Sequence, residues 1–247
     1  LLTAIDKARK SIDIVIFRLD IKEIIDELAA AVTRGVAVRA LIAHTNKGGE
    51  KALRKLETRL LDAGVTVSRT ADELVRYHGK MMIVDGKQLH VQGFNFTWID
   101  IDKSRSFGAV ATAPALVKEG LRLFQADCDR QPYESGSQRL VVSPENARPR
   151  LADFIKGARR QLLIYDANVS DPRMLRLLAD RVASGVDVRI IGKVGARSTV
   201  KAEKYPGKRL HVRAIMRDRQ RAFLGSQSLR SLELDRRREI GIFIHER

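Results

Sequence analysis

Two stretches of the chain show the same order of apolar and polar positions. In the first, the β-branched run at residues 12–17 is typical of a buried strand. Residues 21–33 follow with apolar side chains at helical spacing, and Gly35 is placed to end that helix. Residues 36–42 are again apolar and predict a second strand. A strand-helix-strand unit of this kind is the usual connection between two parallel strands.

The second half of the chain repeats this unit. Residues 162–165 predict a strand, Pro172 lies in the first turn of the next predicted helix, and Gly185 is placed to end it. The segments 35–39 and 185–189 both have the sequence Gly-Val-x-Val-Arg and lead into the second strand of each unit. Because such crossovers are right-handed and bring strands side by side, we expect an α/β fold of two similar halves, each a mixed sheet flanked by helices.

A turn-rich stretch at residues 131–137 separates the two units and suits a linker. A second break, at residues 143–146, would begin the first helix of the second half. We therefore place the boundary near residues 132–145 and predict two domains, residues 1–134 and 140–247.

After its strand-helix-strand unit, each half carries the same set of polar residues and glycine at the same spacing. The basic residue, the Asp, the Asn or Ser, and the Gly follow the histidine by 2, 7, 17 and 30 positions in both halves. The first set is His78, Lys80, Asp85, Asn95 and Gly108, and the second is His211, Arg213, Asp218, Ser228 and Gly241. Two sets in register, inside a repeat found independently, are a specific signal.

These residues resemble the signature of the phospholipase D superfamily, which is His-x-Lys-x4-Asp followed by Gly-Ser-x-Asn, present twice. The resemblance covers nearly the whole chain. The first copy has Gln92-Gly93 where Gly-Ser is usual, and the second keeps Gly225-Ser226 but has Arg213 for Lys and Ser228 for Asn. The resemblance implies that the halves are related by a pseudo-two-fold axis, which brings both histidines to one phosphate. It also implies chemistry without a metal or other cofactor, in a site that a monomer can complete.

The residue types suit cleavage of a phosphodiester. Lys80 and Arg213 can neutralise the non-bridging oxygens, since both side chains are cations that bind phosphate. Three further side chains can donate hydrogen bonds to the same oxygens: Asn95, Ser226 and Ser228. One histidine would attack phosphorus and form a phosphohistidine, while the other protonates the leaving oxygen. Asp85 and Asp218 are expected to support the catalytic group, although Asp85-Gly86 is also a turn dipeptide.

One further position bears on which histidine attacks. Ser106 and Glu239 stand 28 residues after the two histidines, so only the second half has a carboxylate there. The resemblance implies that an acidic residue near this point orients a histidine and often crosses to the other half. If Glu239 crosses, His78 is the nucleophile, and His211, paired at best with Ser106, is the general acid. If Glu239 stays in its own half the roles reverse, and it could instead pair with a neighbouring arginine.

The charge and composition limit the kinds of partner that the protein is expected to bind. The 247 residues carry a formal net charge of +16, which favours an anionic partner such as nucleic acid or an anionic membrane surface. Aromatic residues make up only 5% of the chain, which is few for a base-stacking surface and few for an aromatic anchor at a membrane interface, so the charge does not say which anionic partner is bound. The single cysteine, Cys128, excludes an internal disulfide and a cysteine-based zinc site. The run Arg236-Arg237-Arg238 fits either a solvated surface or the rim of an anionic substrate site.

Three functions remain open from the sequence. The first is a phospholipase D or a cardiolipin-synthase-like transferase acting on phospholipids, and the second is a metal-independent nuclease of the same superfamily. The third is a non-catalytic module that binds anions. No apolar run is long enough to span a membrane, and the chain begins with Leu1. We therefore expect that the natural N-terminus is missing, and that the protein is cytoplasmic or peripherally associated with a membrane.

Overall fold

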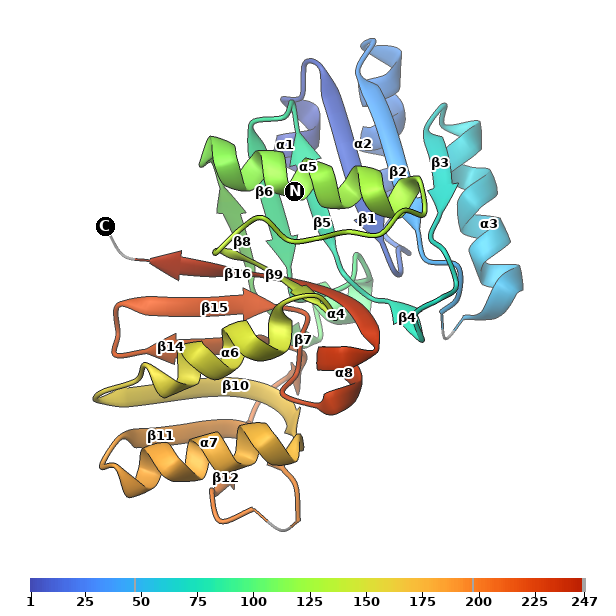
Figure 1. Cartoon of the computed structure of the whole chain (residues 1–247). Helices are drawn as coiled ribbons and strands as arrows, with labels where there is room; N and C mark the ends of the chain where they lie inside the picture. Colours follow the sequence, from blue (N-terminus) through green and yellow to red (C-terminus); the bar gives the residue numbers. More distant parts are fainter. Residues whose placement is uncertain (47, 197, 246–247) are drawn as a thin grey trace.

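The computed structural model describes residues 1–46, 48–196 and 198–245, and it places the two strand-helix-strand units in two sheets that pack against each other (Figure 1). The first sheet has the strand order β3-β2-β1-β5-β6-β8. Its strands are β1 (Ser11–Ile16), β2 (Ala37–Ile42), β3 (Thr66–Arg69), β5 (Met81–Val84), β6 (Gln88–Gln92) and β8 (Gly108–Ala111). The strands β1, β2 and β3 are parallel and the others antiparallel, so the sheet is mixed, as predicted.

The second sheet has the order β12-β11-β10-β14-β15-β16-β4, and β9 also pairs with β16. Its strands are β4 (Arg76–Tyr77), β9 (Leu140–Ser143), β10 (Gln161–Val169), β11 (Asp187–Val194), β12 (Ala202–Glu203), β14 (Arg213–Arg217), β15 (Arg221–Gly225) and β16 (Arg237–His245). A separate pair joins β7 (Ser104–Arg105) to β13 (Arg209–Leu210). Thus β4 and β7, from the first half of the chain, pair with strands of the second half.

Helices cover both sheets. They are α1 (Leu2–Asp6), α2 (Lys22–Thr33), α3 (Gly49–Asp62), α4 (Trp98–Ile101), α5 (Pro114–Cys128), α6 (Ala147–Lys156), α7 (Pro172–Ala183) and α8 (Ser231–Asp235). In Figure 1, α1 and α2 lie behind the first sheet and α5 in front of it, while α6 and α7 lie over the second sheet. Among the described residues, none of these helices has the length and apolar composition needed to cross a membrane.

The register of the strands confirms the repeat. The first parallel pair aligns Ser11 with Ala37, and the second aligns Gln161 with Asp187, so equivalent residues lie 150 positions apart. The next antiparallel pairs align Ile12 with Val84 and Leu162 with Arg217, and from β5 onward the offset is 133. The offset falls because α3 has no counterpart among the described residues of the second half, where β12 pairs with β11 as β3 pairs with β2. The predicted fold class, two similar α/β halves related by a pseudo-two-fold axis, is therefore correct.

Local signals in the sequence explain where the repeated helices begin and end. Asp171 accepts hydrogen bonds from the backbone N–H groups of Arg173 and Met174, which caps α7 just before Pro172. Gly35 and Gly185 follow α2 and α7, and both have φ of +82°, a conformation that favours glycine. Both helices therefore end where the sequence predicts.

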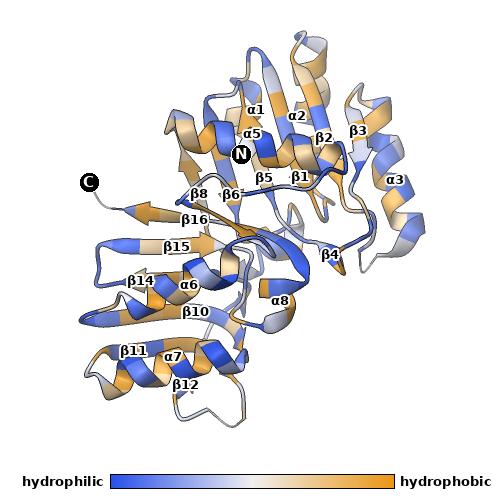
Figure 2. Cartoon of the chain, viewed as in Figure 1, coloured by the Kyte–Doolittle hydropathy of each residue, from blue (hydrophilic) through white to orange (hydrophobic). Residues whose placement is uncertain are grey.

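Three apolar clusters hold the layers together. One lies between the first sheet and the helices α1, α2 and α3, and a second fills the other half. The third joins buried residues of the first half, such as Val91 and Phe124, to Leu140, Val142 and Ile240 of the second. In Figure 2, the strands β9 and β16 that make this contact are coloured apolar over much of their length. Because burying such a side chain stabilises a fold by about 1.5–3 kcal/mol, the shared cluster fixes the halves against each other.

The stretch between α5 and β9 has no helix or strand, and Asn146 directly precedes α6, as the predicted break suggested. The stretch is nevertheless held in place, since the hydroxyl of buried Tyr133 donates a hydrogen bond of 2.6 Å to Glu119. The division into domains at residues 1–134 and 140–247 stays a prediction.

Candidate active site

Each motif histidine is anchored by a short parallel strand pair that crosses between the halves. His78 follows β4, which pairs with β16, and its backbone N–H donates to the carbonyl of Arg238 at 2.7 Å. His211 follows β13, which pairs with β7, and its N–H donates to the carbonyl of Arg105 at 3.1 Å. The two sets of contacts are related by the offset of 133 residues. Both histidines therefore lie at the interface of the halves, beside the pseudo-two-fold axis.

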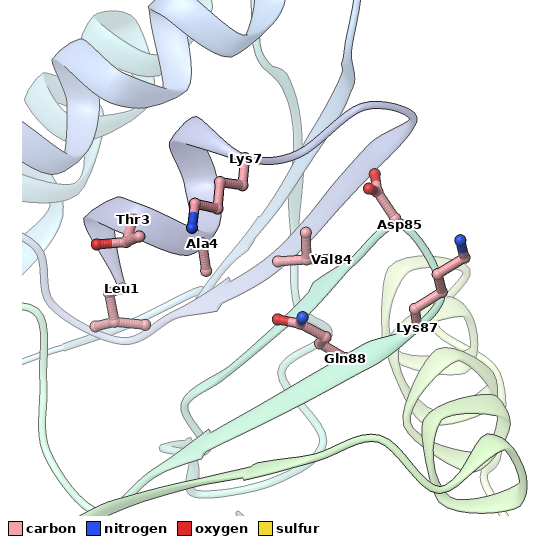
Figure 3. Close-up of a pocket in the computed structure, with 8 residues that line it drawn as sticks. All are labelled: Leu1, Thr3, Ala4, Lys7, Val84, Asp85, Lys87 and Gln88. Carbon is pink, nitrogen blue, oxygen red and sulfur yellow. The ribbon is translucent and has the colours of Figure 1, made fainter.

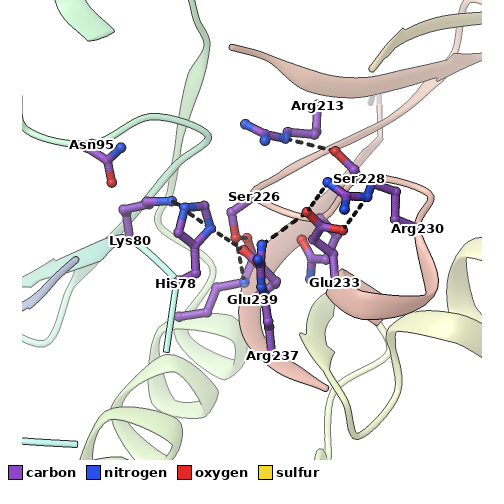
Figure 4. A network of polar contacts seen from close by, with 12 residues as sticks. His78, Lys80, Asn95, Arg213, Ser226, Ser228, Arg230, Glu233, Arg237 and Glu239 are labelled. Carbon is purple, nitrogen blue, oxygen red and sulfur yellow. Dashed lines mark hydrogen bonds and ion pairs between the residues drawn. The ribbon is translucent and has the colours of Figure 1, made fainter. Parts of the chain in front are cut away.

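His78 is held by side chains from both halves (Figure 4). Its Nδ1 lies 2.9 Å from a carboxylate oxygen of Glu239, a fully buried residue of β16. The Nζ of Lys80 lies 3.1 Å from each ring nitrogen of His78, and the Phe17 ring packs edge-on with its centroid 4.5 Å away. Glu239 therefore crosses the interface to His78, which is one of the two arrangements that the sequence leaves open.

Burial and the surrounding cations shift the protonation of this group. Burial, and then Lys80 and Arg213, hold the pKa of His78 well below its ordinary value. Burial also lowers the pKa of Lys80 to about 7, although Glu239 acts in the opposite direction. The pKa of Glu239 is raised by burial, against the effect of Lys80. The imidazole of His78 is therefore neutral near pH 7, and with Nδ1 held by Glu239, its Nε2 can act as a nucleophile.

The second histidine has a carboxylate neighbour that sequence reasoning missed. The Nδ1 of His211 lies 3.4 Å from an oxygen of Asp100, a buried residue of α4 in the first half. The same oxygen accepts hydrogen bonds from the N–H and the side-chain amide of Asn95, at 2.9 and 2.7 Å, and the other oxygen pairs with Arg209. Burial, and then Arg213, lower the pKa of His211 below its ordinary value. Each histidine thus has its Nδ1 beside a carboxylate from the opposite half.

Ser106 was the best partner for His211 that the sequence offered, and this prediction is wrong, because its hydroxyl donates to the backbone carbonyl of Asp100 at 3.3 Å. One signal could have identified Asp100. Asp100 and Glu233 each stand 22 residues after a motif histidine, so both halves have a carboxylate at this position.

The predicted phosphate-binding residues surround the histidines from both halves. Lys80 is completely buried, and Asn95 has a buried side-chain oxygen with no partner among the described residues. The Nε of Arg213 donates to the hydroxyl of Ser228 at 3.2 Å. The hydroxyl of Ser226 accepts from the N–H of Ile240 at 3.1 Å, so it is already engaged with β16. Figure 4 shows Lys80 and Asn95 on one side and Arg213 and Ser228 on the other, with Ser226 between them.

Asp85 and Asp218 do not belong to this group, and their prediction as catalytic residues is corrected. Asp85 follows the far end of β5 from His78 and accepts hydrogen bonds from the N–H groups of residues 9, 10 and 11. Asp218 accepts the equivalent bonds from residues 159, 160 and 161. Figure 3 shows Asp85 beside a surface pocket near α1, which no motif histidine lines. Both carboxylates stabilise turns, the role that Asp85-Gly86 also suggested.

The sequence leaves open whether residues 236–238 form a solvated surface or the rim of a substrate site. In the structure, the three arginines lie in three different environments. Arg236 is exposed. Arg238 is buried and forms ion pairs with Asp127, at 3.0 Å, and Glu145, which joins β16 to α5. Arg237 faces the site and donates to Glu233 at 3.1 Å (Figure 4). Of the three, Arg237 is the one that lies beside Glu239 and Glu233.

Other reactive groups lie apart from this arrangement. Within residues 1–46, 48–196 and 198–245, no three His, Cys, Asp or Glu residues cluster so as to hold a metal ion. Cys128, at the end of α5, is partly buried, and burial raises the pKa of its thiol to about 11. The ionisable groups that the two halves bring together are two neutral imidazoles, their carboxylates and the nearby cations.

Several known proteins resemble the chain. The family model described as "Cardiolipin synthase, PLD-like domain" matches residues 1–128. Polyphosphate kinase from Porphyromonas gingivalis shares the fold with a TM-score of 0.77 and 19% identity, over 98% of this chain and 44% of that one. Phosphatidylserine synthase from Haemophilus influenzae Rd KW20 has a TM-score of 0.74 and 14% identity, over 99% of this chain and 79% of that one. This chain therefore spans less than half of the polyphosphate kinase.

A partial match is the phospholipase D family member NUC from Salmonella typhimurium, with 27% identity and a TM-score of 0.48, over 53% of this chain and 86% of that one. No curated protein matches the chain significantly.

Proposed function

Because this chain belongs to the phospholipase D superfamily, whose members carry out phosphoryl transfer, we propose that it cleaves phosphodiesters through a covalent phosphohistidine and that it acts on phospholipids. The observation that carries the proposal is the pair of crossed contacts at the interface. His78 is held by Glu239, His211 lies beside Asp100, and Lys80 and Arg213 accompany them. A single chain thus supplies both half-sites, so a monomer would suffice.

In the first step, Nε2 of His78 attacks phosphorus, and the bond from phosphorus to the leaving oxygen breaks. His211 gives the leaving oxygen a proton. It must first be protonated, and the negative charge of a bound phosphodiester supports this by raising the pKa of His211 from its depressed value. Lys80 and Arg213 neutralise the non-bridging oxygens as charge develops on them.

In the second step, water or an alcohol attacks the phosphohistidine, and His211 accepts the proton that the attacking oxygen loses. The bond between phosphorus and nitrogen then breaks and frees His78. The acceptor decides the outcome, because water gives hydrolysis and an alcohol gives transfer of the phosphatidyl group. Each histidine therefore reverses its own role between the steps: His78 attacks and then leaves, and His211 donates a proton and then accepts one.

The surface beside the site favours a phospholipid substrate. The helix α4, which carries Asp100, also presents Trp98, Ile99 and Ile101 to solvent, with exposed fractions of 59%, 44% and 49%. Apolar side chains exposed together at a surface often mark a site for a lipid or a protein partner. The family model, described by its cardiolipin synthase members, supports the same substrate class.

A nuclease is the second candidate, and the net charge of +16 supports it. A parallel assay separates the two. Vesicles containing phosphatidylglycerol, single-stranded DNA and duplex DNA are each incubated with the protein and with His78→Ala. We expect release or exchange of the lipid head group by the wild type alone, and an alcohol added to the vesicles should trap the transferred group. Cleavage of DNA without turnover of lipid would establish the nuclease, and equal activity of His78→Ala would show that the site only binds anions.

The assignment of the nucleophile has its own test. His211→Ala is mixed with a phosphodiester that has a nitrophenolate leaving group, which needs little help from an acid, and is then denatured at alkaline pH. Intact-protein and peptide mass spectrometry should find the phosphoryl adduct on His78, and none in His78→Ala. An adduct on His211 in the His78→Ala protein would reverse the roles while retaining the reaction.

A further inference from the structure

Two arginines face each other one row before the histidine and its carboxylate. In the parallel pair of β4 and β16, Arg76 aligns with Arg237, and His78 follows Arg76 by two residues as Glu239 follows Arg237. Side chains two residues apart in a strand point to the same face, about 7 Å apart. Both arginines therefore lie on the face that carries His78 and Glu239.

The ring of Phe17 confirms this placement from the other side. The guanidinium carbon of Arg76 lies 5.6 Å from the centroid of the ring, the Nζ of Lys80 lies 5.6 Å from it, and the His78 ring packs against its edge. One aromatic side chain thus contacts the histidine and a cation on either side of it in the sequence. Arg76 therefore belongs to the same group of side chains around Phe17 as Lys80 and His78.

The two arginines have hydrogen-bonding capacity that the described residues do not use. The Nε atoms of both Arg76 and Arg237 are buried and have no partner among the described residues. Arg237 gives one of its terminal nitrogens to Glu233, which also binds Arg230. A buried donor without an acceptor is unfavourable, so these two Nε–H groups suit a ligand with several acceptor oxygens.

The equivalent residues in the other half already have hydrogen-bond partners within the protein. The counterparts of Arg76 and Arg237, at the offset of 133, are Arg209 and Ser104. Arg209 forms an ion pair with Asp100, and its Nε donates to the hydroxyl of Ser104 at 3.0 Å. An arginine faces a serine there and has a carboxylate of its own, whereas two arginines face each other beside His78. The asymmetry indicates a binding function on the His78 side only.

The charge balance points to the same class of ligand. Among the described residues, six cationic side chains lie around the histidines: Arg76, Lys80, Arg209, Arg213, Arg230 and Arg237. They face four carboxylates: Asp100, Asp166, Glu233 and Glu239. When these groups are all ionised, one phosphodiester charge leaves a positive excess, and burial, and then Arg237, lower the pKa of Arg76. A second negative charge would relieve both.

We propose that Arg76 and Arg237 form a second anion subsite beside His78, which binds a second phosphate carried by the same substrate. This inference rests on the proposed function. It specifies the substrate as a phospholipid whose head group carries a phosphate close to the scissile phosphodiester. The guanidinium groups would bind the phosphate with paired N–H donors, a geometry that a lysine cannot reproduce.

Binding of two small probes to the intact protein tests the subsite without requiring turnover. Isothermal titration compares methylphosphonate, with one anionic group, and methylenebisphosphonate, with two. We expect the wild type to bind the bisphosphonate at least about tenfold more tightly, the usual effect of a charge-assisted contact. Arg76→Gln and Arg237→Gln should each abolish most of this preference and change methylphosphonate binding less than about threefold. Arg236→Gln, on the exposed neighbour, should leave both affinities unchanged.

A further variant distinguishes the loss of the guanidinium group from misfolding of the protein and from a change in the net charge near the site. Arg76→Lys keeps the charge and loses the fork, so it should retain the fold and still lose most of the preference. Equal binding of both probes by the wild type, or equal weakening of both by Arg76→Gln and Arg76→Lys, would refute the second subsite.

Lys80→Met separates this inference from the proposed function, because it should weaken both probes. If Lys80→Met leaves methylphosphonate binding unchanged, the primary phosphate site is wrong and the second subsite fails with it. If Lys80→Met weakens methylphosphonate and the wild type has no preference, only the second subsite is refuted. Finally, kcat/KM on vesicles of phosphatidylglycerol and of its head-group phosphate ester should favour the ester in the wild type but not in Arg76→Gln. Equal values in the wild type would exclude the lipid as the source of the second phosphate.

Discussion

The two motif histidines occupy equivalent places in the repeat, but the carboxylates beside them do not. Glu239 reaches His78 from the strand β16, whereas Asp100 lies beside His211 from the helix α4. The positions equivalent to these carboxylates hold Ser106 and Glu233, and Glu233 is engaged by arginines instead. The two histidines therefore have carboxylate neighbours from different elements, β16 for His78 and α4 for His211. This difference supports the proposal that one histidine is the nucleophile and the other the acid and base.

Asp100→Asn tests this difference at a single residue. If Asp100 orients His211 and stabilises its protonated form, the variant should slow cleavage of an alkoxide leaving group by about ten- to a hundredfold, a part of what general acid catalysis contributes. Cleavage of a nitrophenyl ester, which needs little acid help, should fall less than about threefold. Steady-state kinetics on both substrates provide the measurement. Asp102→Asn, on the exposed neighbour paired with Lys103, is the matched control. Equal loss on both substrates would mean that Asp100 acts only on the fold.

Lys80 predicts a pH dependence of anion binding. Its pKa, lowered to about 7 by burial and by the neighbouring Arg213 and Arg237, means that the free protein loses this proton as the pH rises through 7. A bound anion favours the protonated form, so affinity is constant below pH 7 and falls by up to about tenfold per pH unit above it. Dimethyl phosphate is the suitable ligand, since it remains a monoanion throughout, and titration calorimetry from pH 6 to 9 measures its affinity.

Lys80→Arg is the control for this dependence, because a guanidinium stays charged over the whole range. Its affinity for dimethyl phosphate should not change between pH 7 and 9. A wild-type affinity that is equally flat would contradict the lowered pKa of Lys80.

At the scale of elements, the motif aspartates are explained by the turns that they close. Asp85 and Asp218 have φ of +54° and +52°, and each accepts hydrogen bonds from three backbone N–H groups, at the start of β1 and of β10 respectively. Burial raises the pKa of each carboxyl, but the backbone hydrogen bonds outweigh it and lower the pKa below its ordinary value. The spacing of seven residues from the histidine thus reflects the length of a strand and its turn.

Asp218→Ala should therefore destabilise the protein and leave its chemistry intact. The loss of the carboxylate that accepts from three backbone N–H groups, and of a residue type that tolerates positive φ, should lower the free energy of unfolding by about 1–3 kcal/mol. Urea denaturation measures this, and kcat of the folded fraction should stay within about twofold. Asp218→Asn, which keeps one acceptor and tolerates the same backbone conformation, should lose less. A stable Asp218→Ala protein with strongly reduced kcat would restore Asp218 to the catalytic group.

The elements that the sequence predicts well are those with a complete local signal. The strands β1 and β2 have a run of apolar residues, and the helices α2 and α7 have an apolar period and a terminating glycine, so each is found within about one or two residues of its prediction. The two-residue strands β4, β7 and β13 have no such signal. They form only because the opposite half supplies a partner strand, so local periodicity cannot predict them, nor the contact of Asp100 with His211 that depends on them.

At the scale of the whole molecule, the repeat of the histidine motif predicts the duplicated fold and the shared site, because a half-site alone cannot complete the chemistry. The buried ion pair of Arg238 with Asp127 and the apolar cluster around Phe124 and Ile240 keep the halves together. Neither contact can be derived from pattern alone, since each joins residues more than 100 positions apart. The net charge is also a property of the whole molecule, because it affects how the protein associates with an anionic surface before a substrate enters the site.

The net charge of +16 predicts that salt weakens association with an anionic membrane more than it weakens binding of a phosphate in the site. A vesicle rich in anionic lipid presents many charges to the whole basic surface, and these interactions are screened when the Debye length falls from about 10 Å at 0.1 M salt to about 3 Å at 1 M. Lys80 is completely buried beside His78, so its contact with a single phosphate is screened less. Raising the salt from 0.05 to 0.5 M should therefore lower kcat/KM on anionic vesicles by at least about tenfold. The value for a soluble short-chain phosphodiester should fall less than about threefold.

Neutral vesicles doped with a trace of substrate provide the control, and their salt response should follow that of the soluble substrate. An equal decline on all three substrates would locate the effect of salt in the site itself, and the basic surface would then have no part in capturing the membrane.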